Sequence, residues 1–285
     1  MDYRIWKPKG EPRAIVQLVH GMAEHIGRYD RVAQALNAAG YLAAGRSHRG
    51  HGPQAERLGW FAQEKGWDAL VEDAHSFSQD IRKEYPHLPF ILLGHSMGSF
   101  VSREYALRYG TELSALVLSG TGSYGRGLCT AAQAAARLSP SKKPAKMVDR
   151  LAFSGHNKPF SPNRTPFDWL SRDEAEVDKY IADPYCGFVF TGAAFADFFG
   201  GLKKLADTER LSSLPKGLPV YFLSGDQDPV GQMGKGVEKT AAQFKNAGLR
   251  DVTVKLYPGG RHEMFNETNR QEVYDDLIAW LNQRF

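Results

Sequence analysis

A short run around position 96 has the residue types and the spacing of a catalytic serine. Residues 94–98 read GHSMG and match the pattern G-x-S-x-G. The run follows an apolar stretch, residues 90–93, which predicts a buried strand, and it precedes a helical pattern from Met97 to about Tyr109. In such a strand–turn–helix the serine backbone is strained, and small neighbours leave its hydroxyl exposed. We predict that Ser96 is a nucleophile; the alternative is a serine that only caps the helix.

A serine hydroxyl becomes nucleophilic when a base removes its proton, and the base is a histidine oriented by a carboxylate. Only two histidines follow Ser96 in the chain, His156 and His262. His262 comes just after a predicted strand, residues 252–257, and a glycine pair, so it can reach the same edge of the sheet as Ser96. We therefore predict His262 as the base and read His156 as part of a separate segment.

The carboxylate should follow the preceding strand, residues 219–223, where residues 225–230 read GDQDPV. Pro229 restricts its predecessor to an extended conformation, which favours Asp228 as the triad acid. Asp226 is better suited to forming the turn. The chain order Ser96, Asp228, His262 is the order expected for a G-x-S-x-G enzyme.

An acyl-transfer intermediate also needs N–H donors for its oxyanion. The amide of the residue after the nucleophile, Met97, is one candidate. The second candidate is the amide of Met22, in the HGM run after the predicted strand at residues 14–19.

The secondary-structure elements around these residues must position them. The pattern of apolar residues along the chain predicts strands alternating with helices. Predicted strands cover residues 14–19, 41–44, 90–93, 115–118, 219–223 and 252–257. Predicted helices cover residues 29–39, part of 64–85, 97–109, 236–247 and 271–282. This rhythm indicates an α/β fold with a mostly parallel sheet.

The alternation stops between residues 120 and 205. Residues 151–200 of this stretch contain eleven aromatic side chains, against 12% in the whole chain. We predict an inserted cap at residues 120–205 over an α/β core formed by residues 1–119 and 206–285; the alternative is a continuation of the core. Some cap aromatics are expected to line an acyl-binding channel: Phe153, Phe160, Trp169, Tyr180, Tyr185, Phe188, Phe190, Phe195, Phe198 and Phe199.

Composition excludes several other classes of protein. With 285 residues, 42% of them hydrophobic, and a net charge of +4, the chain is globular and lacks a basic–aromatic array for nucleic acid. No apolar run approaches the ~20 residues of a membrane span, and two cysteines suit a cytoplasmic location. A basic stretch opposed only by Asp149 could rest on anionic lipid, although a solvated face explains it as well: Arg137, Lys142, Lys143, Lys146 and Arg150. Oligomeric state stays open.

Several motifs together resemble the α/β-hydrolase superfamily, and more narrowly its monoacylglycerol lipase and lysophospholipase group with a serine aminopeptidase (S33) domain. They are HGMAEH at 20–25 with Arg28-Tyr29, HRGHG at 48–52, GHSMGS at 94–99, GDQDPV at 225–230 and GRHE at 260–263. The resemblance implies an α/β-hydrolase fold with helices on both faces of the sheet, and it supports Asp228. It places Glu24 and Arg28 near a glycerol-binding end of the pocket; the alternative is an ion pair that shapes the oxyanion loop.

Two features depart from the family pattern. Arg46 and Ser47 stand where the family has an apolar strand residue and an Asp, and a charged arginine in a strand is costly unless it reaches water or a partner. The chain also begins at what looks like the second strand of the family's sheet.

Together these features predict a serine carboxylic-ester hydrolase that acts on monoacylglycerol-like or short- to medium-chain acyl esters through an acyl-enzyme. No cofactor or metal is expected. The alternatives are an aminopeptidase-type peptidase or an acyltransferase using the same triad, and a non-catalytic ligand-binding protein on this fold.

Overall fold

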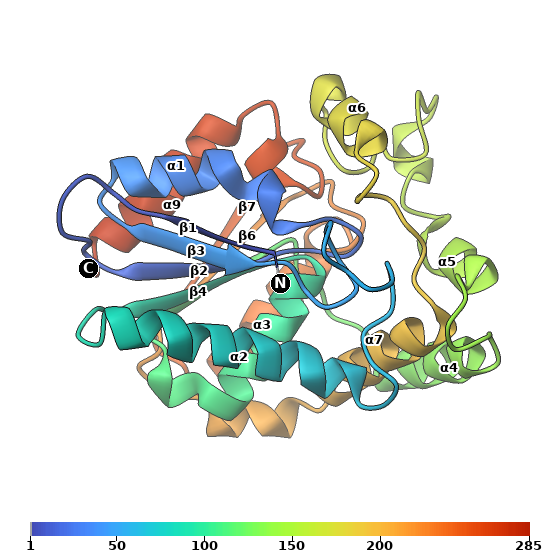
Figure 1. The fold of residues 1–285 in the computed structure, drawn as a ribbon, viewed down its shortest axis with the longest axis horizontal. Helices are drawn as coiled ribbons and strands as arrows, with labels where there is room; N and C mark the ends of the chain where they lie inside the picture. Colours follow the sequence, from blue (N-terminus) through green and yellow to red (C-terminus); the bar gives the residue numbers. More distant parts are fainter. Residues whose placement is uncertain (1) are drawn as a thin grey trace.

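The structure is a computed structural model and describes residues 2–285. Its centre is a seven-stranded sheet in the order β1-β3-β2-β4-β5-β6-β7 (Figure 1). β1 pairs with β3 in the antiparallel sense, and the other neighbours are parallel. The strands are β1 (Tyr3–Trp6), β2 (Ile15–Val19), β3 (Leu42–Arg46), β4 (Phe90–His95), β5 (Ala115–Ser119), β6 (Val220–Gly225) and β7 (Val252–Tyr257). This topology confirms the predicted α/β class and its mostly parallel sheet.

Helices cover both faces of the sheet (Figure 1). Side chains of α1 and α9 share one apolar cluster with Val16 and Leu18 of β2, whereas side chains of α2, α3 and α8 share the other cluster with Ile15 and Val19. Strands buried on both faces need nearly continuous apolar sequence, which explains why β2, β4, β5 and β6 read as apolar runs. The helices are α1 (Asp30–Ala38), α2 (Gly66–Glu84), α3 (Met97–Tyr109), α8 (Lys235–Asn246) and α9 (Arg270–Asn282).

Residues 120–205, which we call the cap segment, lie between β5 and β6 and gather at one end of the sheet (Figure 1). The segment contains α4 (Arg126–Arg137), α5 (Lys146–Phe153), α6 (Glu174–Ala182) and α7 (Gly192–Leu205). α7 packs against α4 on one side and against α2 and α3 of the sheet layer on the other. Short 3-10 turns complete the fold at Ile26–Tyr29, Gly110–Glu112, Lys158–Phe160, Thr208–Ser213 and Met264–Asn266.

The N-terminal strand β1 was not predicted from the residue pattern. It is only four residues long and mostly exposed, so it carries no alternation of buried and exposed side chains. Its partner strand β3 ends at Arg46, which pairs with Tyr3. The Arg46 guanidinium reaches the carboxylate of Asp73 at 4.0 Å, so the charged residue is accommodated at the strand end without disrupting the sheet.

No helix within residues 2–285 is both long enough and apolar enough to cross a lipid bilayer.

Candidate active site

Ser96 lies at the turn between β4 and α3, as the motif predicts. Its φ of 52° and ψ of −121° are unusual for a residue with a side chain, and such strain costs about 1–3 kcal/mol. The glycines on either side are required by space: a Cβ on Gly94 would lie 2.4 Å from the carbonyl oxygen of Gly98, and one on Gly98 would lie 2.0 Å from that of Val19. The turn therefore presents the Ser96 hydroxyl at the carboxyl edge of the sheet.

His262 and Asp228 meet in the loops that follow β7 and β6. His262 Nδ1 lies 3.0 Å from Asp228 Oδ1, and both side chains are buried. Asp228 also accepts hydrogen bonds from the Val230 N–H at 2.9 Å and the Ser224 hydroxyl at 3.1 Å. Because an ionised carboxylate only accepts hydrogen bonds, Nδ1 of His262 carries the proton and Nε2 is left as a base.

Opposing effects set the pKa values of this pair. Burial would raise the pKa of Asp228, but the neighbouring imidazole and three hydrogen bonds outweigh it and hold that pKa below its usual range. Burial would lower the pKa of His262, but the charge of Asp228 and its hydrogen bond raise that pKa above 6.5. His262 is thereby made a stronger base than a free imidazole.

The second aspartate of the loop has a different place. Asp226 Oδ1 accepts a hydrogen bond from the Gly259 N–H at 2.8 Å, and the Asp226 N–H donates to the carbonyl of Tyr257. Asp226 therefore ties the β6 loop to the β7 loop, as a turn-forming residue should. The structure brings Asp228, and not Asp226, to His262.

The loop after β2, residues 20–24, carries Met22 and is held on three sides. Ala23 has a φ of 51°. Its N–H donates to Nε2 of His51 at 3.3 Å, and its carbonyl accepts from the hydroxyl of Tyr180 at 3.0 Å and from the N–H of Gly187 at 2.9 Å. His51 lies in the loop after β3, whereas Tyr180 and Gly187 belong to the cap segment, so the β3 loop and the cap segment fix this loop jointly.

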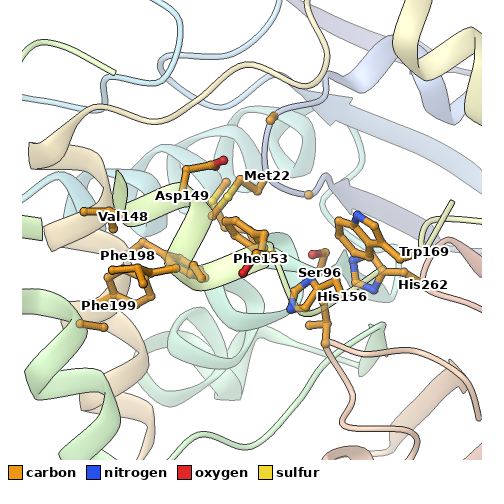
Figure 2. A pocket seen from close by; sticks show the side chains of 18 of the residues that line it. Met22, Ser96, Val148, Asp149, Phe153, His156, Trp169, Phe198, Phe199 and His262 are labelled. Carbon is orange, nitrogen blue, oxygen red and sulfur yellow. The ribbon is translucent and has the colours of Figure 1, made fainter. Parts of the chain in front are cut away.

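A cavity of about 720 Å³ opens in front of Ser96 (Figure 2). Ser96, Trp169 and His262 gather at one end of it, whereas Phe198 and Phe199 lie at the other. Met22 and Met97 also line it. Ser96 Oγ makes no hydrogen bond to His262 in the part of the chain that the structure describes, and such contacts commonly tighten only when substrate binds.

The predicted channel aromatics divide into two groups. Six line the cavity: Phe153, Trp169, Tyr180, Phe188, Phe198 and Phe199. The other four pack elsewhere: Phe190 and Phe195 in the buried core, Phe160 against Arg261, and Tyr185 beside His25.

The comparison with known proteins identifies the family. The model of the serine aminopeptidase S33 family matches residues 10–269. The chain belongs to this family, and to its monoacylglycerol lipase group. The resemblance inferred from the motifs is confirmed.

Relatives of this S33 hydrolase cover nearly the whole chain. It is 34% identical over 283 residues to a monoacylglycerol lipase of Mycolicibacterium smegmatis, covering 98% of this chain and 91% of the relative. It is 29% identical over 300 residues to the monoglyceride lipase of Homo sapiens, covering 99% and 86%. A highly thermostable carboxyl esterase from Bacillus coagulans, solved in complex with glycerol, superposes with a TM-score of 0.91 at 31% identity, covering 99% and 93%. The fold is the α/β-hydrolase fold, and the protein is an enzyme of the lipase and esterase kind.

Glu24 and Arg28 form a buried charge network in this S33 hydrolase. The family resemblance implied that both lie near a glycerol-binding end of the pocket. Arg28 donates to Glu24 at 2.7 Å and makes two hydrogen bonds to Glu263, at 2.8 and 2.7 Å. Glu24 also accepts from the Gly21 N–H at 2.6 Å and the Tyr29 hydroxyl at 2.9 Å. Glu24 lines the large cavity, whereas Arg28 lies behind it. Their contacts are those of an ion pair that holds the loop carrying Met22.

No role was predicted for Glu263 from the sequence, although its position next to His262 in the chain indicated that it lies near the site. Burial would raise its pKa, but Arg28 outweighs burial and lowers the pKa of Glu263 to about 2. Burial raises the pKa of Glu24 despite Arg28. Through Arg28, the loop that carries Met22 is thus connected to the loop that carries His262.

His156, the other histidine after Ser96, lies in the same cavity of the S33 hydrolase (Figure 2). Its ring contacts Trp169 edge-on at 4.9 Å, and Trp169 lies 5.1 Å from the ring of His262. Burial lowers the pKa of His156 to about 4, and its Nδ1 has no hydrogen-bond partner among residues 2–285. A neutral imidazole is therefore available to a polar group of the substrate.

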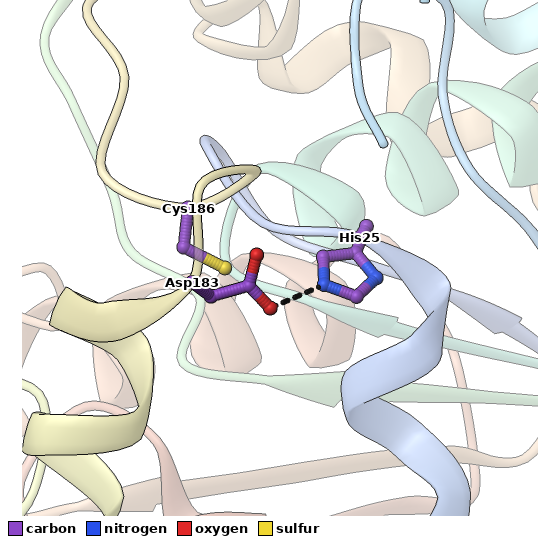
Figure 3. A group of neighbouring side chains, drawn as sticks. All are labelled: His25, Asp183 and Cys186. Atoms are coloured by element: carbon purple, nitrogen blue, oxygen red, sulfur yellow. Dashed lines mark hydrogen bonds and ion pairs between the residues drawn. The ribbon is translucent and has the colours of Figure 1, made fainter. Parts of the chain in front are cut away.

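One cluster has the residue types of a metal site: His25, Asp183 and Cys186 (Figure 3). Nδ1 of His25 accepts a hydrogen bond from the Gly27 N–H at 3.1 Å, so the proton of the neutral ring lies on Nε2, which donates to Asp183 at 2.9 Å. A metal ion would have to displace that proton and disrupt the contact with Gly27. Burial raises the pKa of the Cys186 thiol far above its usual range, which disfavours the thiolate that a metal requires. The cluster is better explained as a hydrogen-bonded contact between His25, which follows the β2 loop, and the cap segment.

Proposed function

We propose that this enzyme hydrolyses monoacylglycerol-like esters through an acyl-enzyme on Ser96. The observation that carries the proposal is the His262–Asp228 pair beside Ser96 at one end of a largely apolar cavity. A cavity of about 720 Å³ lies within the range that encloses a drug-sized ligand, so it can hold an acyl chain.

The chemistry follows from the positions of these groups. Nε2 of His262 accepts the proton of Ser96 as Oγ attacks the ester carbonyl, and the amides of Met22 and Met97 stabilise the oxyanion. His262 then gives the proton to the leaving alcohol, and the C–O bond of the ester breaks. His262 next takes a proton from a water molecule as the water attacks the acyl-enzyme. It returns this proton to Oγ of Ser96 as the bond between Oγ and the acyl carbon breaks and the acid leaves. Asp228 holds the imidazole in the required tautomer and stabilises its charged form.

A glycerol ester is favoured because the reacting end of the cavity is polar and its far end is apolar. Glu24, His156 and Glu263 are polar residues that line the cavity, whereas Phe198 and Phe199 lie at its distal end. The relatives named as monoacylglycerol lipases and the esterase solved with glycerol support the same substrate class.

The peptidase alternative is less well supported because it needs a free carboxylate for the substrate's ammonium group. Arg28 engages both Glu24 and Glu263. The cap acid Glu176 is bound by Arg31 and Lys179, and Glu174 lies 3.7 Å from Arg164. Glu24, Glu174 and Glu176 therefore already have cationic partners. Asp149 also lines the cavity and forms no ion pair among residues 2–285, but burial raises its pKa and so disfavours the charged carboxylate that an ammonium group needs.

The cap segment is proposed to form the acyl-binding channel, which predicts a dependence on chain length. With p-nitrophenyl esters, kcat/KM should rise about fourfold per methylene, since each buried CH2 contributes ~0.8 kcal/mol, up to the limit set by the cavity. Phe198→Ala or Phe199→Ala should move the optimum to longer chains and leave acetate hydrolysis unchanged. Hydrolysis rates for acetate to palmitate esters, monoacylglycerols and aminoacyl anilides measure both chain length and substrate class.

Phe160→Ala is the matched control, because Phe160 is a cap aromatic that does not line the cavity. It should leave the chain-length profile unchanged. A kcat/KM that falls steadily from C2 to C8 in the wild type would show that the cap segment closes the pocket instead, and preferred cleavage of anilides would favour the peptidase.

The mouth of the cavity supports a transient contact with membranes, which we also propose. Four large apolar side chains of α4, α5 and the turn after α4 are exposed: Leu128 (65%), Leu138 (90%), Met147 (69%) and Leu151 (73%). Leu128 and Leu151 also line the cavity, so the apolar surface continues into it. The surrounding basic residues Lys142, Lys143 and Lys146 are exposed and suit an anionic lipid surface.

Replacing Leu138 and Met147 together by Ser should weaken binding to anionic vesicles severalfold, because it removes apolar area from the membrane contact. Neither residue lines the cavity, so hydrolysis of a soluble ester should persist. Co-sedimentation with vesicles measures the binding. Tyr3→Ser, which removes an exposed aromatic on β1, is the control, and equal losses in both proteins would contradict a specific contact.

A further inference from the structure

Arg103 is a buried cation that the proposed mechanism does not use. It lies on α3 with 5% of its surface exposed. Its Nη1 donates to the carbonyl of Gly122 at 3.0 Å, and its Nε has no hydrogen-bond partner within residues 2–285. None of the ion pairs formed by these residues involves Arg103, and burial lowers the pKa of its guanidinium to about 10. Its guanidinium lies over the ring of Phe100, 5.8 Å from the ring centre, but no carboxylate among residues 2–285 pairs with it. A buried charge without a counterion is costly unless something compensates it.

Next to Arg103 lies a small cavity of about 100 Å³. Two further cations line it, Arg126 and Lys239, together with the side chain of Gln243. The backbone of residues 122–125 forms another wall, leading into the first residue of α4. No Asp or Glu is among the residues that line this cavity.

The N-terminus of α4 adds to the positive character of the cavity. α4 is twelve residues long and begins at Arg126 after Gly125, so its unpaired N–H groups and its dipole favour an anion at this end. Arg103 supplies the independent observation, because only 5% of the residue is exposed, it lines the same cavity and it has no carboxylate partner among residues 2–285.

We propose that this cavity, which we call the Arg103 pocket, binds a small oxyanion of the phosphate class. A phosphate offers several oxygens to the guanidinium, the lysine and the helix N-terminus, and arginine pairs with phosphate through two hydrogen bonds. The volume holds several water molecules but is far below the ~300 Å³ of a typical ligand pocket, so a phosphate group fits inside it and a whole nucleotide or acyl chain does not. The same chemistry is offered by free phosphate and by the phosphomonoester headgroup of a lipid.

The Arg103 pocket adjoins the candidate active site. Phe100, Tyr124 and Leu202 line both this pocket and the large cavity. The hydroxyl of Tyr124 donates to the carbonyl of Val230 at 3.0 Å, two residues after Asp228. A bound oxyanion would therefore stiffen a loop that contacts the triad loop, and its effect is expected in thermal stability.

Thermal unfolding with inorganic phosphate tests the proposal. At constant ionic strength, phosphate in place of chloride should raise the Tm of the wild type in a saturable way, by about 2 °C at tenfold excess over the Kd. Titration calorimetry with sodium phosphate gives that Kd directly. The Ser96→Ala protein should respond equally, so this test does not depend on the proposed esterase function.

Two matched double variants localise the site. Arg126→Gln with Lys239→Gln removes two exposed cations of the pocket and should raise the Kd for phosphate at least tenfold. Arg137→Gln with Lys235→Gln removes one exposed cation from each of the same two helices, outside the pocket, and should leave the Kd unchanged. Arg103→Leu should abolish the rise of Tm with phosphate. If this variant does not fold, the two double variants still show whether phosphate binds in the Arg103 pocket. A wild type without a phosphate response, or a pocket variant that responds like the wild type, overturns the proposal.

Vesicles distinguish the two sources of the phosphate group. Phosphatidylcholine vesicles containing phosphatidic acid present a phosphomonoester, whereas those containing phosphatidylglycerol present a diester. Tighter binding to phosphatidic acid that disappears in the pocket variant assigns the site to a lipid headgroup. Equal binding to both lipids, with the phosphate response retained, assigns it to the free ion.

Discussion

Ser96→Ala and His262→Ala are each expected to lower kcat/KM for ester hydrolysis by ~10³-fold or more while the protein stays folded. Ser96 supplies the attacking oxygen and His262 the base, and groups that act as a unit cannot replace one another. Initial rates with a short p-nitrophenyl ester, together with labelling by a fluorophosphonate, measure the loss. The double variant should be no slower than the slower single variant.

The controls are chosen to match the residue types. Ser212→Ala changes an exposed serine and His75→Ala a histidine of α2 that contacts Glu112, both outside the cavity, so both should retain activity. His156→Ala removes the other histidine that follows Ser96 in the chain and should lower kcat/KM less than tenfold. Normal turnover or labelling by pure, folded Ser96→Ala protein would refute the proposed mechanism.

Asp228→Asn is expected to lower kcat by ~10³-fold or more, whereas Asp226→Asn should change it less than tenfold. An Asn at 228 carries no charge to stabilise the protonated imidazole, and in one amide orientation it favours the wrong tautomer of His262. An Asn at 226 can still accept the hydrogen bond from the Gly259 N–H. Steady-state kinetics of both variants rank the two aspartates, and the reverse ranking would place the triad acid at position 226.

The pH profile gives the Asp228 prediction a second readout. A base must be neutral, so the kcat/KM of the wild type should rise with pH through the pKa of His262, which lies above 6.5. Asp228→Asn removes the carboxylate that raises this pKa and leaves burial, which lowers it. The residual activity of the variant should therefore rise at a lower pH than that of the wild type, and an unshifted profile would show that Asp228 does not act on His262.

Within the candidate site, local sequence was sufficient wherever neighbours in the chain decide the conformation. The GHSMG turn, the apolar run before it and Pro229 act over a few residues, so the places of Ser96 and Asp228 could be predicted from steric rules. The parallel sheet followed from the period of the apolar residues. The four-residue β1 could not be predicted, because an exposed edge strand has no buried face to produce a pattern.

The partners of buried polar groups were decided only by the tertiary structure. Arg28 bonds to Glu263, 235 positions away, and the loop of Met22 is held by Tyr180 and Gly187 of the cap segment. His156 lies in the cavity of His262, although the two come from separate parts of the chain. Periodicity and turn chemistry specify which way a side chain faces, but hydrogen bonds and ion pairs depend on distances that packing alone sets. The motifs therefore determined the chemistry of this protein, whereas the fold determined which buried charges position it.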